Sequence, residues 1–203
     1  MKILAIGRNY AEHIKELNNE RPEEPVIFTK PDSALLKNGA HFYHPDYSND
    51  IHHEIELVLK ICKVGKNIDI KFAHNYYDQI GLGIDFTARD LQQKAKEKGL
   101  PWAIAKGFDG SAPISGFIDK SDFKDINDIN FSLNVNGEVR QKGNTSLMLF
   151  SFDYIISYLS KFFTLKKGDL IFTGTPKGVG PIAIGEKLDG YIENERLLEV
   201  TIK

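Results

Sequence analysis

Turn-forming residues divide this chain into short apolar segments, and this division restricts the fold more than any other feature of the sequence. Segments with an alternating or continuously apolar pattern predict β-strands. They lie at residues 2–6, 26–29, 54–64, 79–87, 114–118, 129–135 and 170–173, and around Tyr191 and Val200. The dipeptide Asn136-Gly137, directly after one of them, is typical of a tight hairpin turn. We therefore expect a mainly β protein.

Helical patterns are fewer and cover residues 9–17, 70–77, 90–98 and 147–163. Asp90 is expected to cap the third helix, and Gly99 to end it. Apolar residues cover most of the circumference of the fourth helix, which we expect to be largely buried. The polar stretch 18–25 is expected to be a surface loop or a flap over a site. The predicted fold class is mainly β with mixed α/β character, in which a few helices pack on the sheets.

The length and charge of the chain further restrict the class of protein to which it can belong. Its 203 residues suffice for one well-buried core, so we expect a single domain over residues 1–203. The 26 basic and 28 acidic residues are mixed, without the basic stripe that nucleic-acid binding requires. We find neither a signal-peptide pattern nor the roughly 18 consecutive apolar residues of a membrane span. We therefore expect a cytoplasmic protein with no nucleic-acid partner and no membrane partner.

Cys62 is the only cysteine of the chain. This count excludes an intrachain disulfide and a cysteine-based zinc site made by one chain. Because Cys62 lies in an apolar segment, we expect a buried structural thiol rather than a catalytic one.

Three carboxylates lie in segments that are predicted to be strands. Glu54 and Glu56 are two residues apart, so on a strand they project from the same face at a spacing of about 7 Å. Asp85 stands in an apolar run, where a buried carboxylate needs a counter-charge or a metal ion. The alternatives are a solvent-exposed strand face for the pair and a capping or turn role for Asp85. If the two strands are neighbours, the three carboxylates surround one point and favour Mg²⁺, Mn²⁺ or Ca²⁺ over zinc.

His13 and Glu16 lie three residues apart on a predicted helix and therefore on one face of it. A carboxylate that holds one imidazole nitrogen makes the other nitrogen a better general base, although a plain surface pair is the alternative. Arg89, Gln92 and Lys106 carry cationic or amide groups that are suited to bind a carboxylate. For Arg89 and Gln92 the alternative is simple solvation on a helix surface, whereas Lys106 stands in the turn-rich segment 105–108.

The segment 174–180 (GTPKGVG) is rich in glycine, which allows the backbone to approach an anion closely. It has neither the spacing of a phosphate-binding P-loop nor the glycine pattern of a dinucleotide-binding turn. The sequence also has no Gly-x-Ser-x-Gly motif, which argues against a serine hydrolase.

Four motifs in a fixed order resemble those of the fumarylacetoacetate hydrolase family. They are HHEIEL at 52–57, DFTARD at 85–90, KGLPW at 98–102 and FTGTPKGVG at 172–180. The likeness extends from about residue 7 to residue 181. Two stretches, GRNYAEH at 7–13 and GLPW at 99–102, are most similar to the short, single-domain acylpyruvases and oxaloacetate decarboxylases.

This resemblance implies a fumarylacetoacetate hydrolase-type β-sandwich roll with a few peripheral helices, assembled as a homodimer. It also implies roles for the matching residues: Glu54, Glu56 and Asp85 as ligands of Mg²⁺ or Mn²⁺, Lys106 as a substrate and enolate contact, His13 with Glu16 as a water-activating dyad on a lid, and Arg8, Arg89, Gln92 and Thr175 as substrate-binding residues.

The implied activity is metal-dependent cleavage of a C–C bond in a small 2-keto acid. It proceeds by acylpyruvate hydrolysis, by oxaloacetate decarboxylation to pyruvate, or by both. The alternatives within the family are 2-hydroxyhepta-2,4-diene-1,7-dioate isomerase and 5-oxopent-3-ene-1,2,5-tricarboxylate decarboxylase of aromatic degradation. An alternative of a different class is a metal-binding homologue without catalytic activity.

Overall fold

Three β-sheets form the framework of the protein in a computed structural model, which describes residues 1–16 and 20–203. The seven-stranded sheet has the order β2-β1-β12-β6-β7-β9-β3, the five-stranded sheet the order β11-β10-β14-β15-β4, and the three-stranded sheet the order β13-β5-β8. The strands are β1 (Ile3–Gly7), β2 (Val26–Lys30), β3 (Leu35–Lys37), β4 (His41–Phe42), β5 (Ile51–His53), β6 (Ile55–Ile61), β7 (Tyr77–Ile84), β8 (Thr87–Ala88), β9 (Ala112–Asp119), β10 (Asn130–Val135), β11 (Glu138–Asn144), β12 (Leu170–Phe172), β13 (Gly180–Pro181), β14 (Lys187–Ile192) and β15 (Glu195–Ile202).

The helices are short. They are α1 (Ala11–Glu16), α2 (Ile70–Ala73), α3 (Arg89–Lys98), α4 (Ala103–Lys106) and α5 (Phe152–Phe162), with 3₁₀ turns at Asp32–Ala34, Lys120–Asp122 and Thr145–Leu147. No helix in the described part of the chain is long and apolar enough to cross a membrane. The fold class is mainly β with few helices, as predicted.

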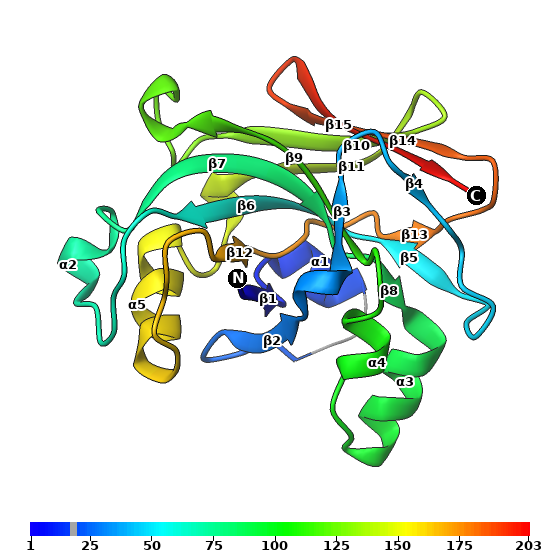
Figure 1. Ribbon diagram of the computed structural model, residues 1–203, viewed down its shortest axis with the longest axis horizontal. Helices are drawn as coiled ribbons and strands as arrows, with labels where there is room; N and C mark the ends of the chain where they lie inside the picture. Colours follow the sequence, from blue (N-terminus) through cyan, green and yellow to red (C-terminus); the bar gives the residue numbers. More distant parts are fainter. Residues whose placement is uncertain (17–19) are drawn as a thin grey trace.

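The main core lies between the two larger sheets. Figure 1 shows the five-stranded sheet above the curved strands β6, β7 and β9, with α3 and α4 at one side and α2 and α5 at the other. Leu57 and Leu59 of β6 and Leu82 of β7 pack with Leu133 of β10 and Leu198 of β15 in one buried cluster. Burial of this apolar surface is the main stabilising contribution to such a stack.

The opposite face of the seven-stranded sheet holds the polar residues. Side chains alternate along a strand, so Val58 packs in the second apolar cluster while Leu57 packs in the first. Glu56 lies two residues before Val58 and therefore shares its face. Helix α4 contacts β2 and β8 on this side, close to the end of the sheet where β6 begins. The fold thus places Glu56 on the face of the sheet that α4 contacts through β2.

Several predicted boundaries differ from the structure because of contacts that are distant in sequence. Helix α3 begins at Arg89, and Asp90 does not cap it but accepts from Ser48 Oγ at 2.7 Å. Gly99 ends this helix with φ 65°, as expected. Helix α5 begins only at Phe152, since Ser151 Oγ accepts from the Tyr154 amide at 3.3 Å.

The structure tests two further expectations, the hairpin turn at residues 136–137 and the burial of Cys62. Asn136 and Gly137 have φ 52° and 85° between β10 and β11, which confirms the predicted hairpin turn. Cys62, expected to be buried, is partly exposed, because the strand β6 ends one residue before it. The predicted end of the first helix at residue 17 and the start of the following loop at 18 lie outside the described residues.

Candidate active site

Three carboxylates meet at the ends of β6 and β7. Glu54, Glu56 and Asp85 each place one oxygen within 4.8 Å of the others, and their residues are only 5%, 2% and 1% exposed. The strands pair so that the Asp85 amide donates to the Glu54 carbonyl at 2.8 Å, which brings the two side chains together. The alternative of a solvent-exposed strand face is therefore wrong. We call these three residues the carboxylate cluster.

Buried cations compensate most of this negative charge, as the burial of ions requires. Lys106 Nζ lies 2.8 Å from Glu54 Oε2, 2.5 Å from Asp85 Oδ2 and 2.6 Å from Thr87 Oγ1. Arg89 donates to the other oxygen of Glu54. Burial alone would lower the pKa of Lys106, but Asp85 and Glu54 outweigh it and raise the pKa. The amine therefore stays protonated at neutral pH.

Glu56 is the member of the carboxylate cluster that has no cationic side chain as a partner among the described residues. Its Oε2 accepts from the Gly174 amide at 2.7 Å. Burial, and then the charges of Asp85 and Glu54, raise the pKa of Glu56 well above its ordinary value. By contrast, Lys106 and Arg89 outweigh burial at Glu54 and hold its pKa well below its ordinary value.

This uncompensated carboxylate fits a divalent cation. The donor atoms are all carboxylate oxygens, which hard ions such as Mg²⁺ and Mn²⁺ prefer. A cation at the carboxylate cluster would relieve the repulsion that keeps the pKa of Glu56 raised. The structure thus brings the three predicted ligands together in a chemically suitable set.

The predicted dyad is formed on α1. His13 Nδ1 lies 3.2 Å from Glu16 Oε2, and the Gly178 amide donates to Glu16 Oε1 at 3.0 Å. Burial lowers the pKa of His13, although Glu54 and Glu16 oppose this effect. Because His13 is only 5% exposed and burial lowers its pKa below the ordinary 6.5, the neutral form of the imidazole is favoured at pH 7. Its Nε2 is then able to accept a proton once Nδ1 carries the hydrogen toward Glu16.

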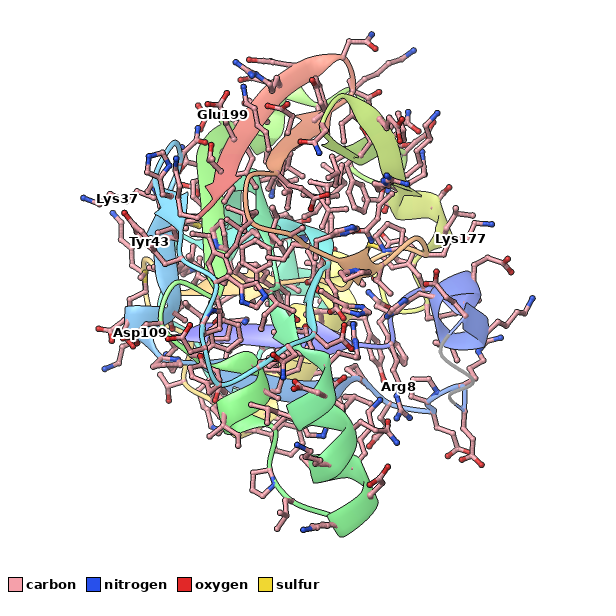
Figure 2. The ribbon with its side chains drawn as sticks, turned by 90° about the vertical axis from the view of Figure 1, so that its right-hand side faces the viewer. Arg8, Lys37, Tyr43, Asp109, Lys177 and Glu199 are labelled. Carbon is pink, nitrogen blue, oxygen red and sulfur yellow. The ribbon has the colours of Figure 1, made fainter. Side chains whose placement is uncertain are left out.

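The four residues predicted to bind substrate lie at the edge of this arrangement. Arg89 donates from one guanidinium nitrogen to Gln92 Oε1 at 2.7 Å and from the other to the carboxylate cluster. Thr175 directly follows Gly174, the residue that donates to Glu56. Arg8 has φ 60°, an uncommon value for a residue with a side chain. In Figure 2 its labelled side chain lies between α1 and α3.

The loop 174–180 connects the carboxylate cluster to helix α1, which carries His13 and Glu16. Besides the contacts of Gly174 and Gly178, Lys177 Nζ lies 3.8 Å from Glu12 Oε2 on α1, and Figure 2 labels Lys177 beside this helix. The loop therefore contacts both β6 and the helix that carries the dyad. Its glycines serve close backbone contacts, since a Cβ at Gly178 would lie 2.2 Å from the Arg140 carbonyl oxygen.

Two residues of this region were missed by sequence reasoning. Lys30, at the end of β2, has a fully buried side chain with its Nζ 2.8 Å from Asp85 Oδ1. A lysine at the end of an apolar strand was the available signal. Gln141 of β11 is 1% exposed, accepts from His53 Nδ1 at 2.9 Å and donates to Thr175 Oγ1 at 2.9 Å. Its sequence neighbours are polar and exposed and gave no signal.

Comparison with known proteins agrees with this arrangement. Residues 2–203 match the profile of the fumarylacetoacetate (FAA) hydrolase C-terminal family. The chain is 50% identical over 186 residues to the mitochondrial oxaloacetate decarboxylase of Dictyostelium discoideum, covering 91% of this chain and 85% of that protein. It is 44% identical over 201 residues to the mitochondrial oxaloacetate tautomerase FAHD1 of Mus musculus, covering 99% and 91%.

A solved structure of a similar protein has the same fold. The crystal structure of fumarylpyruvate hydrolase from Pseudomonas aeruginosa, in complex with Mn²⁺ and pyruvate, superimposes with a TM-score of 0.94 at 38% identity. The match covers 100% of this chain and 89% of that one. On the family profile, the sequence identities and the common fold, this chain belongs to the fumarylacetoacetate hydrolase family.

Proposed function

We propose that this protein is an Mg²⁺- or Mn²⁺-dependent enzyme that cleaves a C–C bond in a small 2-keto acid. The reactions are hydrolysis of an acylpyruvate, decarboxylation of oxaloacetate to pyruvate, or both. The observation that carries this proposal is the buried carboxylate cluster, with Lys106 Nζ within 2.8 Å of two of its members and the hydrogen-bonded His13–Glu16 pair on α1. The relatives named for oxaloacetate and fumarylpyruvate chemistry support it.

Glu54, Glu56 and Asp85 would hold the cation. When bound, such an ion supplies Lewis-acid stabilisation of the negative charge that develops as the bond to C3 breaks. Lys106 adds a fixed positive charge beside the same cluster, since its amine is protonated and is already held by Glu54 and Asp85. Arg89 and Gln92, which are hydrogen-bonded to each other at 2.7 Å, would orient the carboxylate of the keto acid.

Hydrolysis of an acylpyruvate also needs a water molecule as nucleophile. His13, oriented by Glu16, would take one proton from this water as it attacks the distal carbonyl. Cleavage then gives a carboxylic acid and the enolate of pyruvate, which takes up the proton to form pyruvate. Decarboxylation of oxaloacetate needs no water as nucleophile: the C3–C4 bond breaks, CO₂ leaves, and the resulting enolate of pyruvate takes one proton from solvent. The dyad is thus required for the first reaction only.

A second candidate is keto–enol isomerisation, and the relative named a tautomerase favours it. A neutral His13 beside the carboxylate cluster is suited to move a proton without breaking a C–C bond. The 2-hydroxyhepta-2,4-diene-1,7-dioate isomerase of aromatic degradation remains an alternative, which a solved structure of that name from Mycobacterium marinum, 33% identical to this chain, supports in part. The 5-oxopent-3-ene-1,2,5-tricarboxylate decarboxylase and the non-catalytic homologue remain alternatives without such an observation.

The assembly and surroundings of the enzyme stay predictions. We propose a homodimer, a single catalytic domain over residues 1–203, and no nucleic-acid or membrane partner. We also keep the cytoplasm as the expected compartment, although two of the relatives named above are mitochondrial.

The experiment that separates these functions measures two signals at once. Enol absorbance and released pyruvate are followed for acetylpyruvate and oxaloacetate, with Mg²⁺, with Mn²⁺ and with EDTA, corrected for spontaneous decay. Metal-dependent release of pyruvate supports C–C cleavage. A change in enol absorbance without pyruvate supports isomerisation instead. Binding of metal with neither signal would leave only the non-catalytic homologue or a longer substrate.

A further inference from the structure

Asn9 lies where three segments of the chain meet, and it has no role in the site as described so far. It stands between β1 and α1, two residues before the helix that carries His13 and Glu16. The residue is 0% exposed although its side chain is polar. A buried carboxamide is costly unless its hydrogen-bonding groups are satisfied, so the partners of this side chain indicate what it holds in place.

The side chain of Asn9 uses both of its polar ends. Its Nδ2 donates to the carbonyl oxygens of Phe150 and Thr173, at 3.1 and 2.8 Å, and its Oδ1 accepts from the Phe150 amide at 2.8 Å. Both hydrogens of the amide group are therefore in use. The Leu149 amide donates to the backbone carbonyl of the same residue at 2.9 Å. Asn9 thus joins the start of α1 to residues 149–150 and to the residue that follows β12.

The peptide unit between Thr173 and Gly174 connects Asn9 to the carboxylate cluster. Its carbonyl oxygen accepts from Asn9 Nδ2, and its N–H donates to Glu56 Oε2 at 2.7 Å. A trans peptide unit is planar, and its C=O and N–H point in opposite directions. Holding the carbonyl therefore also fixes the direction of the N–H. The amide of Gly174 is the one hydrogen-bond donor to Glu56 in the described part of the chain.

Gly174 allows Asn9 to approach this peptide unit closely. A Cβ at position 174 would lie 2.6 Å from Asn9 Cβ and 3.2 Å from the Ile6 carbonyl oxygen. Gly174 also has φ 102°, a value that residues with a side chain rarely adopt. The polar contact and the steric contact of Asn9 therefore act on the same peptide unit.

We propose that Asn9 is a positioning residue of the metal site. Through the peptide unit 173–174 it holds the carboxylate of Glu56 in place for a divalent cation, and it ties this carboxylate to the helix of the His13–Glu16 pair. The inference rests on the proposed function, because it assigns Asn9 to the same site. Groups that hold a metal ligand in place typically contribute about 10- to 100-fold to metal affinity.

The test measures the Mn²⁺ affinity by titration calorimetry, which does not depend on turnover. Asn9→Leu keeps a similar volume without hydrogen-bonding groups and should weaken Mn²⁺ binding about tenfold or more. Asn9→Ala, which needs less space, should give a similar loss.

Ser160→Ala in α5 is the matched control, because Ser160 is also 0% exposed. Its Oγ accepts from the Ile68 amide and donates to the Ser157 carbonyl, at 2.8 Å each. This variant therefore loses buried hydrogen bonds away from the carboxylate cluster, and its Mn²⁺ affinity should not change. Urea unfolding of each variant shows that it is folded and how much stability it has lost.

An unchanged Mn²⁺ affinity in the Asn9 variants would overturn the positioning role, as would an equal loss of affinity in Ser160→Ala. Where neither Asn9 variant folds, Gly174→Ala displaces the same peptide unit from the other side. It should weaken Mn²⁺ binding as well, and an unchanged affinity would again overturn the inference.

Pyruvate release from acetylpyruvate and oxaloacetate separates this inference from the proposed function. If the unaltered protein binds Mn²⁺ with the Asn9-dependent affinity but releases no pyruvate, the proposed function fails and the positioning role stands. If it releases pyruvate while the Asn9 variants bind Mn²⁺ as tightly as it does, the positioning role fails and the proposed function stands. Absence of Mn²⁺ and Mg²⁺ binding by the unaltered protein overturns both.

Discussion

Lys30 and Asp85 form an ion pair that is closed off from solvent. Lys30 Nζ lies 2.8 Å from Asp85 Oδ1, and the two side chains are 0% and 1% exposed. The same ammonium donates to Ser111 Oγ at 3.0 Å and to the carbonyl oxygen of Lys106. The side chain of Lys106 donates in turn to the other oxygen of Asp85. One buried lysine therefore fixes both a proposed metal ligand and the backbone of the proposed enolate contact.

Replacing Lys30 should destabilise the fold strongly. The variant Lys30→Met leaves Asp85 with one counter-charge fewer in a buried site. Removing one partner of a buried ion pair costs about 3 to 5 kcal/mol of unfolding free energy. Urea unfolding in EDTA measures this loss, and Lys37→Met at an exposed position is the control. The double variant Lys30→Met/Asp85→Asn should recover part of the stability; additive losses would contradict the pairing.

Glu56→Gln should have opposite effects on stability and on metal binding. Because the pKa of Glu56 is raised above its ordinary 4.5 by burial and by Asp85 and Glu54, its ionised form disfavours the metal-free fold. The wild-type protein in EDTA should therefore lose stability, relative to Glu56→Gln, as the pH rises above about 4.5 and through the raised pKa. Thermal unfolding across this range, for both proteins, measures the difference.

The same variant should lose the stabilisation that Mg²⁺ or Mn²⁺ gives. A ligand that binds only the folded state raises Tm by an amount that grows with the logarithm of its concentration divided by its Kd, and Glu56→Gln removes a charged donor. We expect a metal-induced shift of Tm for the wild type and for Glu195→Gln, an exposed control. A full shift in Glu56→Gln would show that Glu56 is not a ligand.

Removal of the dyad should separate the two proposed reactions. His13→Ala is expected to lower acylpyruvate hydrolysis by about 10²- to 10⁴-fold, the usual contribution of a general base. Oxaloacetate decarboxylation, which needs no activated water, should be much less affected. Parallel losses of both reactions, with metal still bound, would contradict this division. Glu16→Gln should give a smaller loss, because it keeps a hydrogen-bond partner for His13.

The pH dependence of hydrolysis should report on His13. Burial lowers its pKa below the ordinary 6.5, so the neutral base persists over the neutral range. The rate of hydrolysis should be level near pH 7 and fall only as the pH drops through the lowered pKa, where the imidazole gains a proton. Measuring kcat/KM for acetylpyruvate between pH 4.5 and 8 tests this. If kcat/KM already begins to fall at a pH above 6.5, the ordinary pKa of histidine, then the pKa of His13 is not lowered and this prediction is wrong.

The carboxylate cluster was predictable because two local rules act together. The two-residue period of a strand places Glu54 and Glu56 on one face, and burial of Asp85 demands compensation. Only the pairing of β6 with β7 had to be assumed. The motif likeness then assigned roles that no spacing rule gives.

The position of Lys30, the two-residue strands and the role of Asp90 could not be predicted, because they depend on contacts between segments that are distant in sequence. Lys30 precedes Asp85 by 55 positions, and the strands that carry them to the site, β2 and β7, are separated by three others in the seven-stranded sheet, so no local pattern could pair them. The two-residue strands β4 and β13 were missed, since their pairing partners, not their own pattern, define them. Asp90 was wrong as a cap because the helix begins one residue earlier, at Arg89, and the carboxylate of Asp90 accepts from the sequence-distant Ser48 Oγ instead.

Gln141 joins the active-site loop to the sheets, and its replacement should loosen that loop. Its Oε1 accepts from His53 Nδ1 and from the Ile55 amide at 2.9 and 3.0 Å, and its Nε2 donates to Thr175 and Pro176 at 2.9 Å each.

Gln141→Leu would keep the volume but leave buried donors and acceptors unpaired, at a cost of about 3 kcal/mol of unfolding free energy. Because Thr175 is a proposed substrate contact, KM should rise more than kcat falls. Lys142→Met, on the exposed face of the same strand, is the control. Unfolding and steady-state kinetics of the two variants measure both effects. Lost stability with an unchanged KM would mean that Gln141 supports the fold without positioning the loop for substrate.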